Sequence, residues 1–302
     1  MSVTNQSSVS KFLLLGLSRH AQEQQVLFML FLSMYLATVL GNLLIILTSI
    51  TDSHLQTPMY FFLRNLSFVD ICFTSTTVPE MLAKYILRRQ TISFPGCLTQ
   101  IYFLILFADM DNFLLTVMTY NCFVAVCHFL HYTTKMTHQL CVLLVAGSWV
   151  IVNLNALLHI LLMAQLSFYA DTILHFFCDM SPLLKLSCSD TQLNDMMILT
   201  AAGPIIIAPF ICILISYILI TYAALKVPST KGEWKAFSTC ASHLAMVSLF
   251  YGTIIALYFN PSSSHSAETD TAATVIYTVV TPMLNPFIYS LRNKDMKRVY
   301  EK

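Results

Sequence analysis

Seven long apolar stretches, separated by short polar segments, dominate the pattern of the chain. Each is long enough to cross a bilayer as a helix, which takes about 20 mainly apolar residues. We therefore expect an all-α membrane protein in which seven transmembrane helices form one bundle. The expected spans are residues 26–50, 58–78, 98–127, 139–163, 196–225, 236–259 and 271–291.

The composition leaves no room for a soluble domain. The chain is 57% hydrophobic and only 10% charged, whereas soluble domains are about 25% charged. One membrane domain is expected over residues 1–302, with an N-terminal segment at 1–25, a long loop at 164–195 and a tail at 292–302. Because the sequence holds no Gly-rich phosphate loop, zinc-type spacing or nucleophile elbow, neither an enzyme nor a nucleic-acid partner is expected.

The distribution of charge favours an N-terminus outside the cell. Seven spans place the two termini on opposite sides, and basic residues collect on the cytoplasmic side of membrane proteins. The more basic side holds the C-terminal tail and alternate loops, with Lys135, Lys226, Lys231, Lys235, Arg292, Lys294, Lys297, Arg298 and Lys302. Asn5 starts a glycosylation acceptor triplet on the other side, which agrees. The short tail is either an amphipathic helix on the inner leaflet or a solvated cluster of charges.

Three of the nine cysteines lie on the expected outer side, where disulfides form. Cys97 lies at the start of the third span, and Cys178 and Cys188 lie in the 164–195 loop. A bridge between Cys97 and Cys178 would hold this loop over the mouth of the bundle and leave Cys188 over. The other six cysteines are read as small apolar residues in or beside the spans.

The last span contains two prolines and an asparagine. Pro282, Asn285 and Pro286 are costly inside a membrane unless neighbouring helices satisfy the backbone groups that they free. They predict a bundle whose cytoplasmic end can deform.

Four sequence motifs together carry a resemblance to a known family. They are Gly41-Asn42 in the first span, LQTPMYFFL at 55–63, KAFSTCASHL at 235–244 and PMLNPFIYS at 282–290. Over essentially its whole length the chain resembles a mammalian olfactory (odorant) receptor of the rhodopsin-like G-protein-coupled class. The resemblance implies a rhodopsin-like bundle in the plasma membrane of olfactory sensory neurons. It also implies a small odorant as ligand, a heterotrimeric G protein of the stimulatory, olfactory type as partner, and raised cAMP as output.

Two positions depart from the family pattern. The third span ends in Asn121-Cys122-Phe123, where the family usually has Asp-Arg-Tyr and the arginine engages the G protein. Tyr169 stands where the family usually has a cysteine, paired with the one matching Cys188. The first departure raises the alternative of a weakly coupled or silent receptor, and the second predicts that a further loop disulfide is absent.

The resemblance also assigns residues to activation. Tyr217 and Tyr289 match tyrosines that rearrange on activation, and Pro286 weakens its helix locally. The base of the sixth span would face the G protein with Lys235, Ser238, Thr239 and His243.

Four polar residues are expected to meet in the middle of the bundle. By resemblance Asp111 lies near Asp70, with Asn42 and Asn285 in reach. Two close carboxylates favour a bound cation or a shared proton. We expect either a sodium-like ion site that stabilises the resting bundle or a protonated, hydrogen-bonded network. No other cofactor is expected.

Asp109 lies about 18 Å along the third helix from Cys97, near the bilayer middle. It either contacts a ligand or bonds internally, for example to His159. By resemblance the ligand pocket is mostly apolar, which suits a small ligand with one polar atom. Its expected lining is Leu104, Ile105, Ala108, Asp109, Ala201, Ile205, Ile206, Tyr251, Ile254, Ile255, Tyr258 and Thr278. Tyr251 is the expected switch, since a phenol can exchange hydrogen bonds between spans; the alternative is a packing role.

A small transporter or channel is the alternative from another functional class. The odd number of spans and the absence of repeated halves argue against it.

Overall fold

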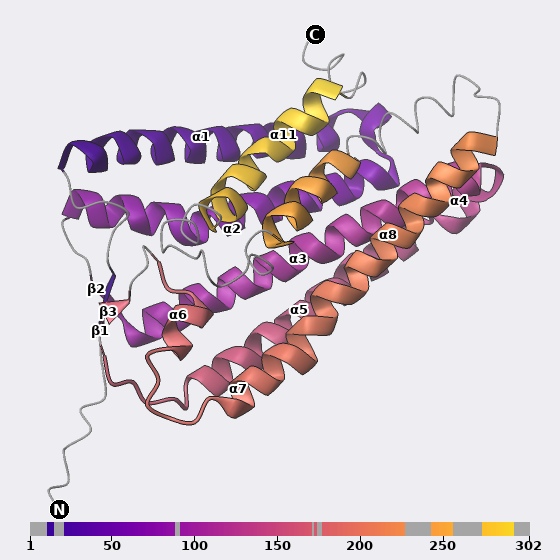
Figure 1. Cartoon of the computed structure of the whole chain (residues 1–302). Coiled ribbons are helices and arrows are strands. Elements are labelled where there is room, and N and C mark those ends of the chain that lie inside the picture. Colours follow the sequence, from indigo (N-terminus) through magenta and orange to yellow (C-terminus); the bar gives the residue numbers. More distant parts are fainter. Residues whose placement is uncertain are drawn as a thin grey trace, which may run out of the picture.

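The computed structural model describes residues 11–14, 21–87, 91–170, 172–173, 177–226, 243–255 and 274–292. Within these residues, seven long helical segments lie side by side in an elongated bundle (Figure 1). The first four are α1 (Ala21–Thr51), α2 (Pro58–Leu87), α3 (Phe94–Cys127) and α5 (His138–Met163). The fifth joins α7 (Gln192–Met197), the π-helical turn η3 (Ile198–Ala202) and α8 (Gly203–Lys226). The last two are the helix His243–Ile255 and the segment formed by η4 (Ile276–Val280) and α11 (Thr281–Arg292).

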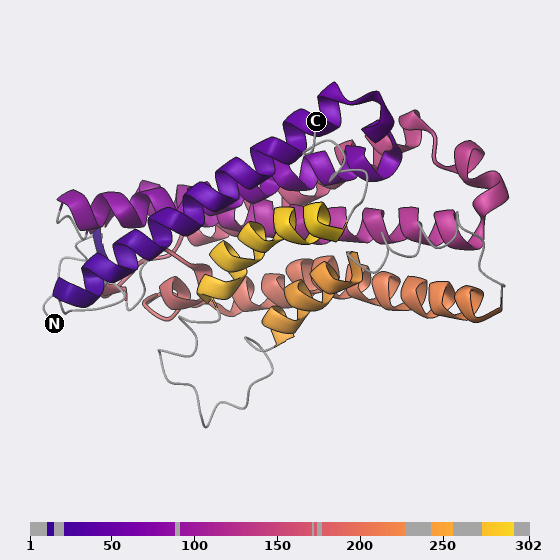
Figure 2. The same ribbon diagram turned by 90° about the horizontal axis from the view of Figure 1, so that it is seen from above.

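Helix α3 runs through the middle of the bundle. Two thirds of its most apolar window (67%) is buried, against 22% for α1 and 11% for the α7–α8 segment. Helix α1 and the α7–α8 segment lie on opposite sides of the bundle (Figure 2). Both keep large apolar side chains exposed, such as Leu40 and Ile218. A helix that is apolar all round is either buried or faces lipid. Helix α3 also carries more of the candidate site residues than any other described helix.

Among the described residues, four helices are long and apolar enough to cross a membrane. They are Glu23–Thr51, Phe94–Cys127, His138–Met163 and Gln192–Ala223. Helix α1 begins at the end of the bundle that holds the small sheet, and α11 ends towards the opposite end (Figure 1). The described helices thus form the expected bundle of seven segments.

Several helices extend beyond the expected spans, for local reasons. Helix α2 continues past Pro79 to Leu87 instead of ending at 78. Helix α3 begins at Phe94 instead of 98, because Ser93 caps it by accepting a hydrogen bond from the Gly96 N–H (3.2 Å). Thr137 caps α5 in the same way.

The disulfide end of the bundle carries a small sheet that the sequence analysis did not predict. Strand β1 (Lys11–Leu14) pairs antiparallel with β2 (Thr91–Ser93) and parallel with β3 (Thr172–Ile173). Phe12 is fully buried, with its ring 6.1 Å from Phe94 and 5.5 Å from Phe168. The 164–195 loop is thus partly ordered, and it also holds α6 (Met180–Leu184) and the start of α7.

The opposite end is closed by short turns. They are η1 (Ser53–Leu55) between α1 and α2, and η2 (Phe129–His131) with α4 (Tyr132–Lys135) between α3 and α5. Gly41 explains how α1 and α11 approach each other, because a Cβ there would lie 2.8 Å from Cγ of Pro286. Close packing against Pro286 therefore requires glycine at this position.

Candidate functional site

A disulfide and two hydrogen bonds of Gln100 connect the 164–195 loop to α3 and α2. Cys97 and Cys178 are bonded, with Cα atoms 5.4 Å apart, as predicted. The Cys178 N–H donates to Oε1 of Gln100 (2.9 Å), and Nε2 of Gln100 donates to the Thr76 carbonyl on α2 (2.9 Å). Gln100, which the sequence analysis missed, thus connects the loop, α3 and α2.

Hydrogen bonds pair the two loop segments that hold Tyr169 and Cys188. Cys188 is free and exposed, and its N–H donates to the Ser167 carbonyl (2.9 Å). The Tyr169 N–H donates to the Leu186 carbonyl (3.2 Å), and the Tyr169 hydroxyl donates to the Lys185 carbonyl (3.3 Å). The two chain segments therefore stay paired without a covalent link.

A buried polar cluster lies between α3 and α5. Nδ2 of Asn155 donates to Oδ2 of Asp109 (2.8 Å), and both side chains are buried. Asp109 therefore forms a hydrogen bond within the bundle, as one of the two alternatives predicted, but its partner is Asn155 and not His159. His159 is buried one helical turn further along the same face of α5. In the described part of the chain, Oδ1 of Asn155 and Nε2 of His159 have no hydrogen-bond partner. We call Asp109, Asn155 and His159 the outer cluster.

Tyr251 belongs to a hydrogen-bond chain that joins three helices. Its hydroxyl donates to Oδ1 of Asn112, and Nδ2 of Asn112 donates to the Ile205 carbonyl (2.7 Å). The Tyr251 ring also packs against Phe210, with centroids 4.7 Å apart. Asn112 lies one turn beyond Asp109 on α3, so this chain lies directly below the outer cluster. The sequence analysis missed Asn112, although an asparagine beside Asp111 in an apolar span was a usable signal.

The expected lining residues divide into several groups. Leu104, Ile105, Ala108, Ile206 and Ile254 share the apolar core with Tyr251, whereas Ala201 lies half-buried in η3.

Three other lining predictions have different outcomes. Thr278 is buried but donates to the Thr274 carbonyl of its own helix (2.8 Å). Ile255 is 45% exposed, and its predicted role in the lining stays a prediction. Tyr258 lies outside the described residues.

The four polar residues predicted to meet do gather between α1, α2, α3 and α11. Nδ2 of Asn285 donates to Oδ2 of Asp70 (2.7 Å), and Nδ2 of Asn42 donates to the carbonyls of Thr38 and Pro282 (3.0 and 3.2 Å). The carboxyl group of Asp111 lies close enough to that of Asp70 for the two to interact electrostatically. One side-chain oxygen of each of the four residues is buried without a partner among the described residues. Two of these oxygens belong to carboxyl groups and two to side-chain amides, and both kinds are oxygen ligands that hard cations use.

Uncharged residues contact Asn121, Cys122 and Phe123, which differ from the family pattern at the end of α3. The Tyr132 hydroxyl donates to Oδ1 of Asn121 (2.8 Å), and Nδ2 of Asn121 donates to Sδ of Met59 (3.5 Å). Burial raises the pKa of Tyr132 to about 12, so its phenol stays protonated and remains a donor. Cys122 is buried against Ile220, and Phe123 packs beside it.

His243 is fully buried at the base of the sixth helix, so the prediction that it faces a partner is wrong for this structure. Nε2 lies 2.7 Å from Oγ1 of Thr119 and 3.0 Å from the Leu115 carbonyl, while Nδ1 lies 3.2 Å from the Tyr289 hydroxyl. The imidazole thus joins the sixth helix to α3 and α11, and its ring lies 6.2 Å from that of Tyr217 on α8. We call Leu115, Thr119, His243 and Tyr289 the inner cluster.

Some predicted positions lie outside the described residues. They are Asn5, Lys235, Ser238, Thr239 and the tail beyond Arg292.

Comparison with known proteins agrees with this geometry. The chain has the fold of squid rhodopsin, with a TM-score of 0.73 and 16% identity, over 93% of this chain and 80% of that one. It is 72% identical to "Olfactory receptor 1F1" of Homo sapiens, over all of this chain and 97% of that protein. It is 71% identical, with the same coverage, to "Olfactory receptor 1f45" of Rattus norvegicus. The model of the family described as "Olfactory receptor" matches residues 31–302. The chain therefore belongs to the olfactory receptor family, whose members are seven-helix G-protein-coupled receptors in the membrane.

Proposed function

We propose that this receptor binds small, mainly apolar odorants that carry one hydroxyl or amine, and that the bound odorant activates a stimulatory, olfactory-type G protein to raise cAMP. The observation that supports the proposal is the outer cluster, where two buried polar atoms have no partner among the described residues. A buried polar group without a hydrogen bond costs about 1–3 kcal/mol, so a ligand that completes the bond gains affinity. The disulfide end faces outwards in this proposal, in the plasma membrane of olfactory sensory neurons.

The chemistry of the outer cluster favours a ligand that donates a hydrogen bond. Oδ1 of Asn155 and the carboxylate of Asp109 are acceptors. Apolar side chains in the same core, such as Leu104 and Ile206, suit a hydrocarbon body. An aliphatic alcohol or amine satisfies both requirements, whereas a pure hydrocarbon leaves the polar atoms unpaired.

Signalling would pass through the chain of Tyr251, Asn112 and Ile205. A ligand seated at the outer cluster lies one helical turn from Asn112 and competes for the packing of Tyr251. Movement of Tyr251 would displace the sixth helix, whose first described residue, His243, is hydrogen-bonded to Thr119 and Tyr289. The ligand shifts this equilibrium only by its different affinity for the two states.

A cAMP assay in cells, with surface staining as control, tests the proposal. Asn155→Leu should lower the potency of alcohols about tenfold, because one buried hydrogen bond is worth roughly 1–2 kcal/mol. Asn153→Leu is the matched control on the same helix, since Asn153 bonds to Tyr102 instead (2.7 Å). If both variants keep the parent's ranking and potency for a panel of alcohols and hydrocarbons, the outer cluster is not the ligand site.

A silent receptor is the second candidate, and the contacts of Asn121 favour it. The end of α3 is bonded to Tyr132 and Met59 and carries no charge, so the arginine that engages a G protein in the family is missing. The double variant Asn121→Asp with Cys122→Arg restores the family pattern. If it responds to odorants where the parent gives no cAMP at equal surface level, the parent is silent.

We also propose that Asp70, Asp111, Asn42 and Asn285 hold a sodium ion in the resting bundle. The four buried oxygens support an oxygen-ligated cation. Asp111→Asn removes one charge and should abolish the effect of sodium on basal cAMP. An unchanged sodium effect would leave the alternative of a protonated network.

A further inference from the structure

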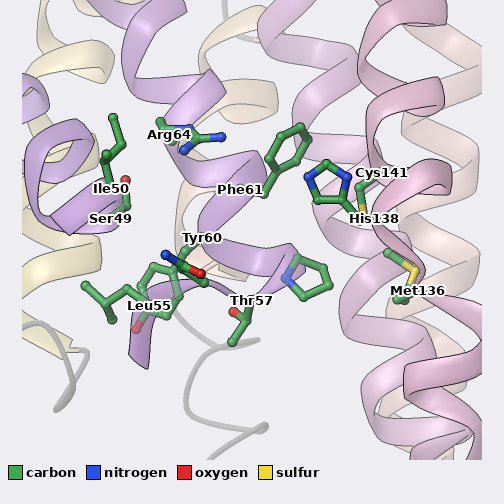
Figure 3. Close-up of a pocket in the computed structure, with 12 residues that line it drawn as sticks. Ser49, Ile50, Leu55, Thr57, Tyr60, Phe61, Arg64, Met136, His138 and Cys141 are labelled. Atoms are coloured by element: carbon green, nitrogen blue, oxygen red, sulfur yellow. The ribbon is translucent and has the colours of Figure 1, made fainter. Parts of the chain in front are cut away.

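A pocket at the end opposite the disulfide plays no part in the function proposed above. Its volume is about 460 Å³, within the usual range for ligand sites. The end of α1, the turn η1, the first two turns of α2 and the α4–α5 connection form its walls (Figure 3). We call it the inner pocket.

The inner pocket carries positive charge and no acidic side chain. Of its twelve lining residues, Arg64 is a cation and none is Asp or Glu. In the described part of the chain, Arg64 forms no ion pair, and its guanidinium carbon lies 5.3 Å from the centre of the Phe61 ring. The His138 ring lies 5.7 Å from the same ring, and Figure 3 shows Phe61 between the two. The guanidinium is therefore supported by an aromatic face and keeps its hydrogen-bond donors available.

The local backbone adds to this positive potential. Helices α2 and α5 both begin at the pocket, with Pro58 and His138 as their first residues. The N-terminal end of a helix carries a partial positive charge. Asp52 belongs to the neighbouring turn, but its carboxylate accepts from the His54 N–H (2.9 Å) and is not part of the lining. An anion is therefore favoured over a neutral ligand.

In the membrane orientation proposed above, the pocket would lie at the level where lipid tails meet headgroups. Arg64 is about 9 Å along α2 from Pro58, and helical side chains lean towards the N-terminus of their helix, which directs the guanidinium to the membrane surface. Long basic side chains near helix ends extend to the interface in this way. On α1, Leu47 and Ile50 expose 57% and 53% of their surface, and Ile50 borders the pocket. An acyl chain on the apolar flank of α1 can therefore continue into a headgroup in the pocket.

We propose that the inner pocket binds the phosphate of an anionic phospholipid of the cytoplasmic leaflet, with Arg64 as the main ligand and the acyl chains along α1. The proposal depends on the orientation proposed above but not on any odorant or G protein. The cytoplasmic leaflet is the one rich in anionic lipid, which agrees with the charge of the pocket. The bound lipid would join α1 and η1 to α4 and α5, and so stabilise the turns at this end.

Native mass spectrometry of the full-length purified receptor tests this lipid site directly. Phosphatidylserine is the probe, phosphatidylcholine is the zwitterionic comparison, and glycerophosphoserine is the headgroup without acyl chains. We expect phosphatidylserine to bind best, and Arg64→Gln to weaken its binding about fivefold, as one basic residue near a membrane surface is worth about 1 kcal/mol. Lys135→Gln is the matched control, because Lys135 is exposed on α4 at the same end, outside the lining.

These measurements distinguish lipid binding in the inner pocket from attraction of lipid to basic residues anywhere on this end of the molecule. Equal losses for Arg64→Gln and Lys135→Gln would overturn the proposal, as would equal binding of phosphatidylcholine. Strong binding of glycerophosphoserine alone would show a soluble anion as the occupant instead of a lipid. Thr57→Phe fills part of the inner pocket without changing its charge, and it should weaken phosphatidylserine binding as much as Arg64→Gln does. Thermal unfolding should show that both variants fold.

Discussion

The two ends of the bundle are held together by different kinds of contact. At the disulfide end, a covalent bond, a three-stranded sheet and the bonds of Gln100 fix the loop to the helices. At the opposite end, the sixth helix is held to its neighbours by the bonds of His243. Neutral hydrogen bonds contribute about 1 kcal/mol each and exchange readily, whereas a disulfide does not. The disulfide end is therefore held by a bond that does not exchange, whereas the contacts at the opposite end can rearrange.

Breaking the disulfide should have the largest effect. The bond spans 81 residues of sequence. Removing a native disulfide from a small domain costs about 2–5 kcal/mol. Cys97→Ser should therefore remove most of the receptor from the cell surface, as measured by staining of intact cells. Cys188→Ser is the control and should have little effect, because Cys188 is free; equal losses would contradict the assigned bond.

Gly41→Ala tests packing in the helices that connect the two ends. The added methyl group would lie 2.8 Å from Cγ of Pro286 and force α1 and α11 apart. Overpacking of this kind costs about 1–3 kcal/mol. Thermal unfolding in detergent should show a lower Tm, whereas Gly147→Ala should not, since no atom lies within 4 Å of its added Cβ. A Tm for Gly41→Ala equal to that of the parent would be evidence against the close approach.

His243→Leu should loosen the inner end without affecting the outer one. It removes the contacts with Thr119 and Tyr289 and frees the base of the sixth helix. Two lost bonds of about 1 kcal/mol each should raise basal cAMP roughly tenfold or more in a receptor that couples. Tyr289→Phe removes one contact and should give a smaller rise. A fall in basal cAMP at normal surface level would mean that His243 supports the active state.

Tyr132→Phe should have the smallest effect. The loss of one partly buried bond to Asn121 should cost about 1 kcal/mol. Burial raises the pKa of Tyr132 from its ordinary 10.0 to about 12. The neutral phenol therefore stabilises the fold fully below pH 10, and this contribution is lost only as the pH rises through about 12. The difference in Tm between parent and variant should be the same at pH 6 and pH 9, and a difference that shrinks between these values would contradict the assignment.

Membership of the family also settles the class of activity. The chain is a receptor of the olfactory receptor family and not an enzyme. The inner pocket lies at the end of the bundle opposite the disulfide, beside α4, which carries Tyr132.

Local patterns determined much of this protein from its sequence alone. Seven apolar stretches can satisfy their backbone only as spanning helices, which predicted the bundle. The positions of Cys97 and Cys178 predicted the disulfide, and the motifs at Gly41-Asn42, 55–63, 235–244 and 282–290 predicted the family. Helix ends were less accurate, because the cap at Ser93 and the continuation through Pro79 depend on contacts beyond the apolar pattern.

The tertiary structure alone decided which polar side chains meet. In helices that are apolar on every side, periodicity does not reveal which face points inwards. It therefore did not show that Asp109 bonds to Asn155, that His243 is buried, or that Ile255 is exposed. Strand β1 and the inner pocket also depend on segments that are far apart in the chain and come together only when the helices pack.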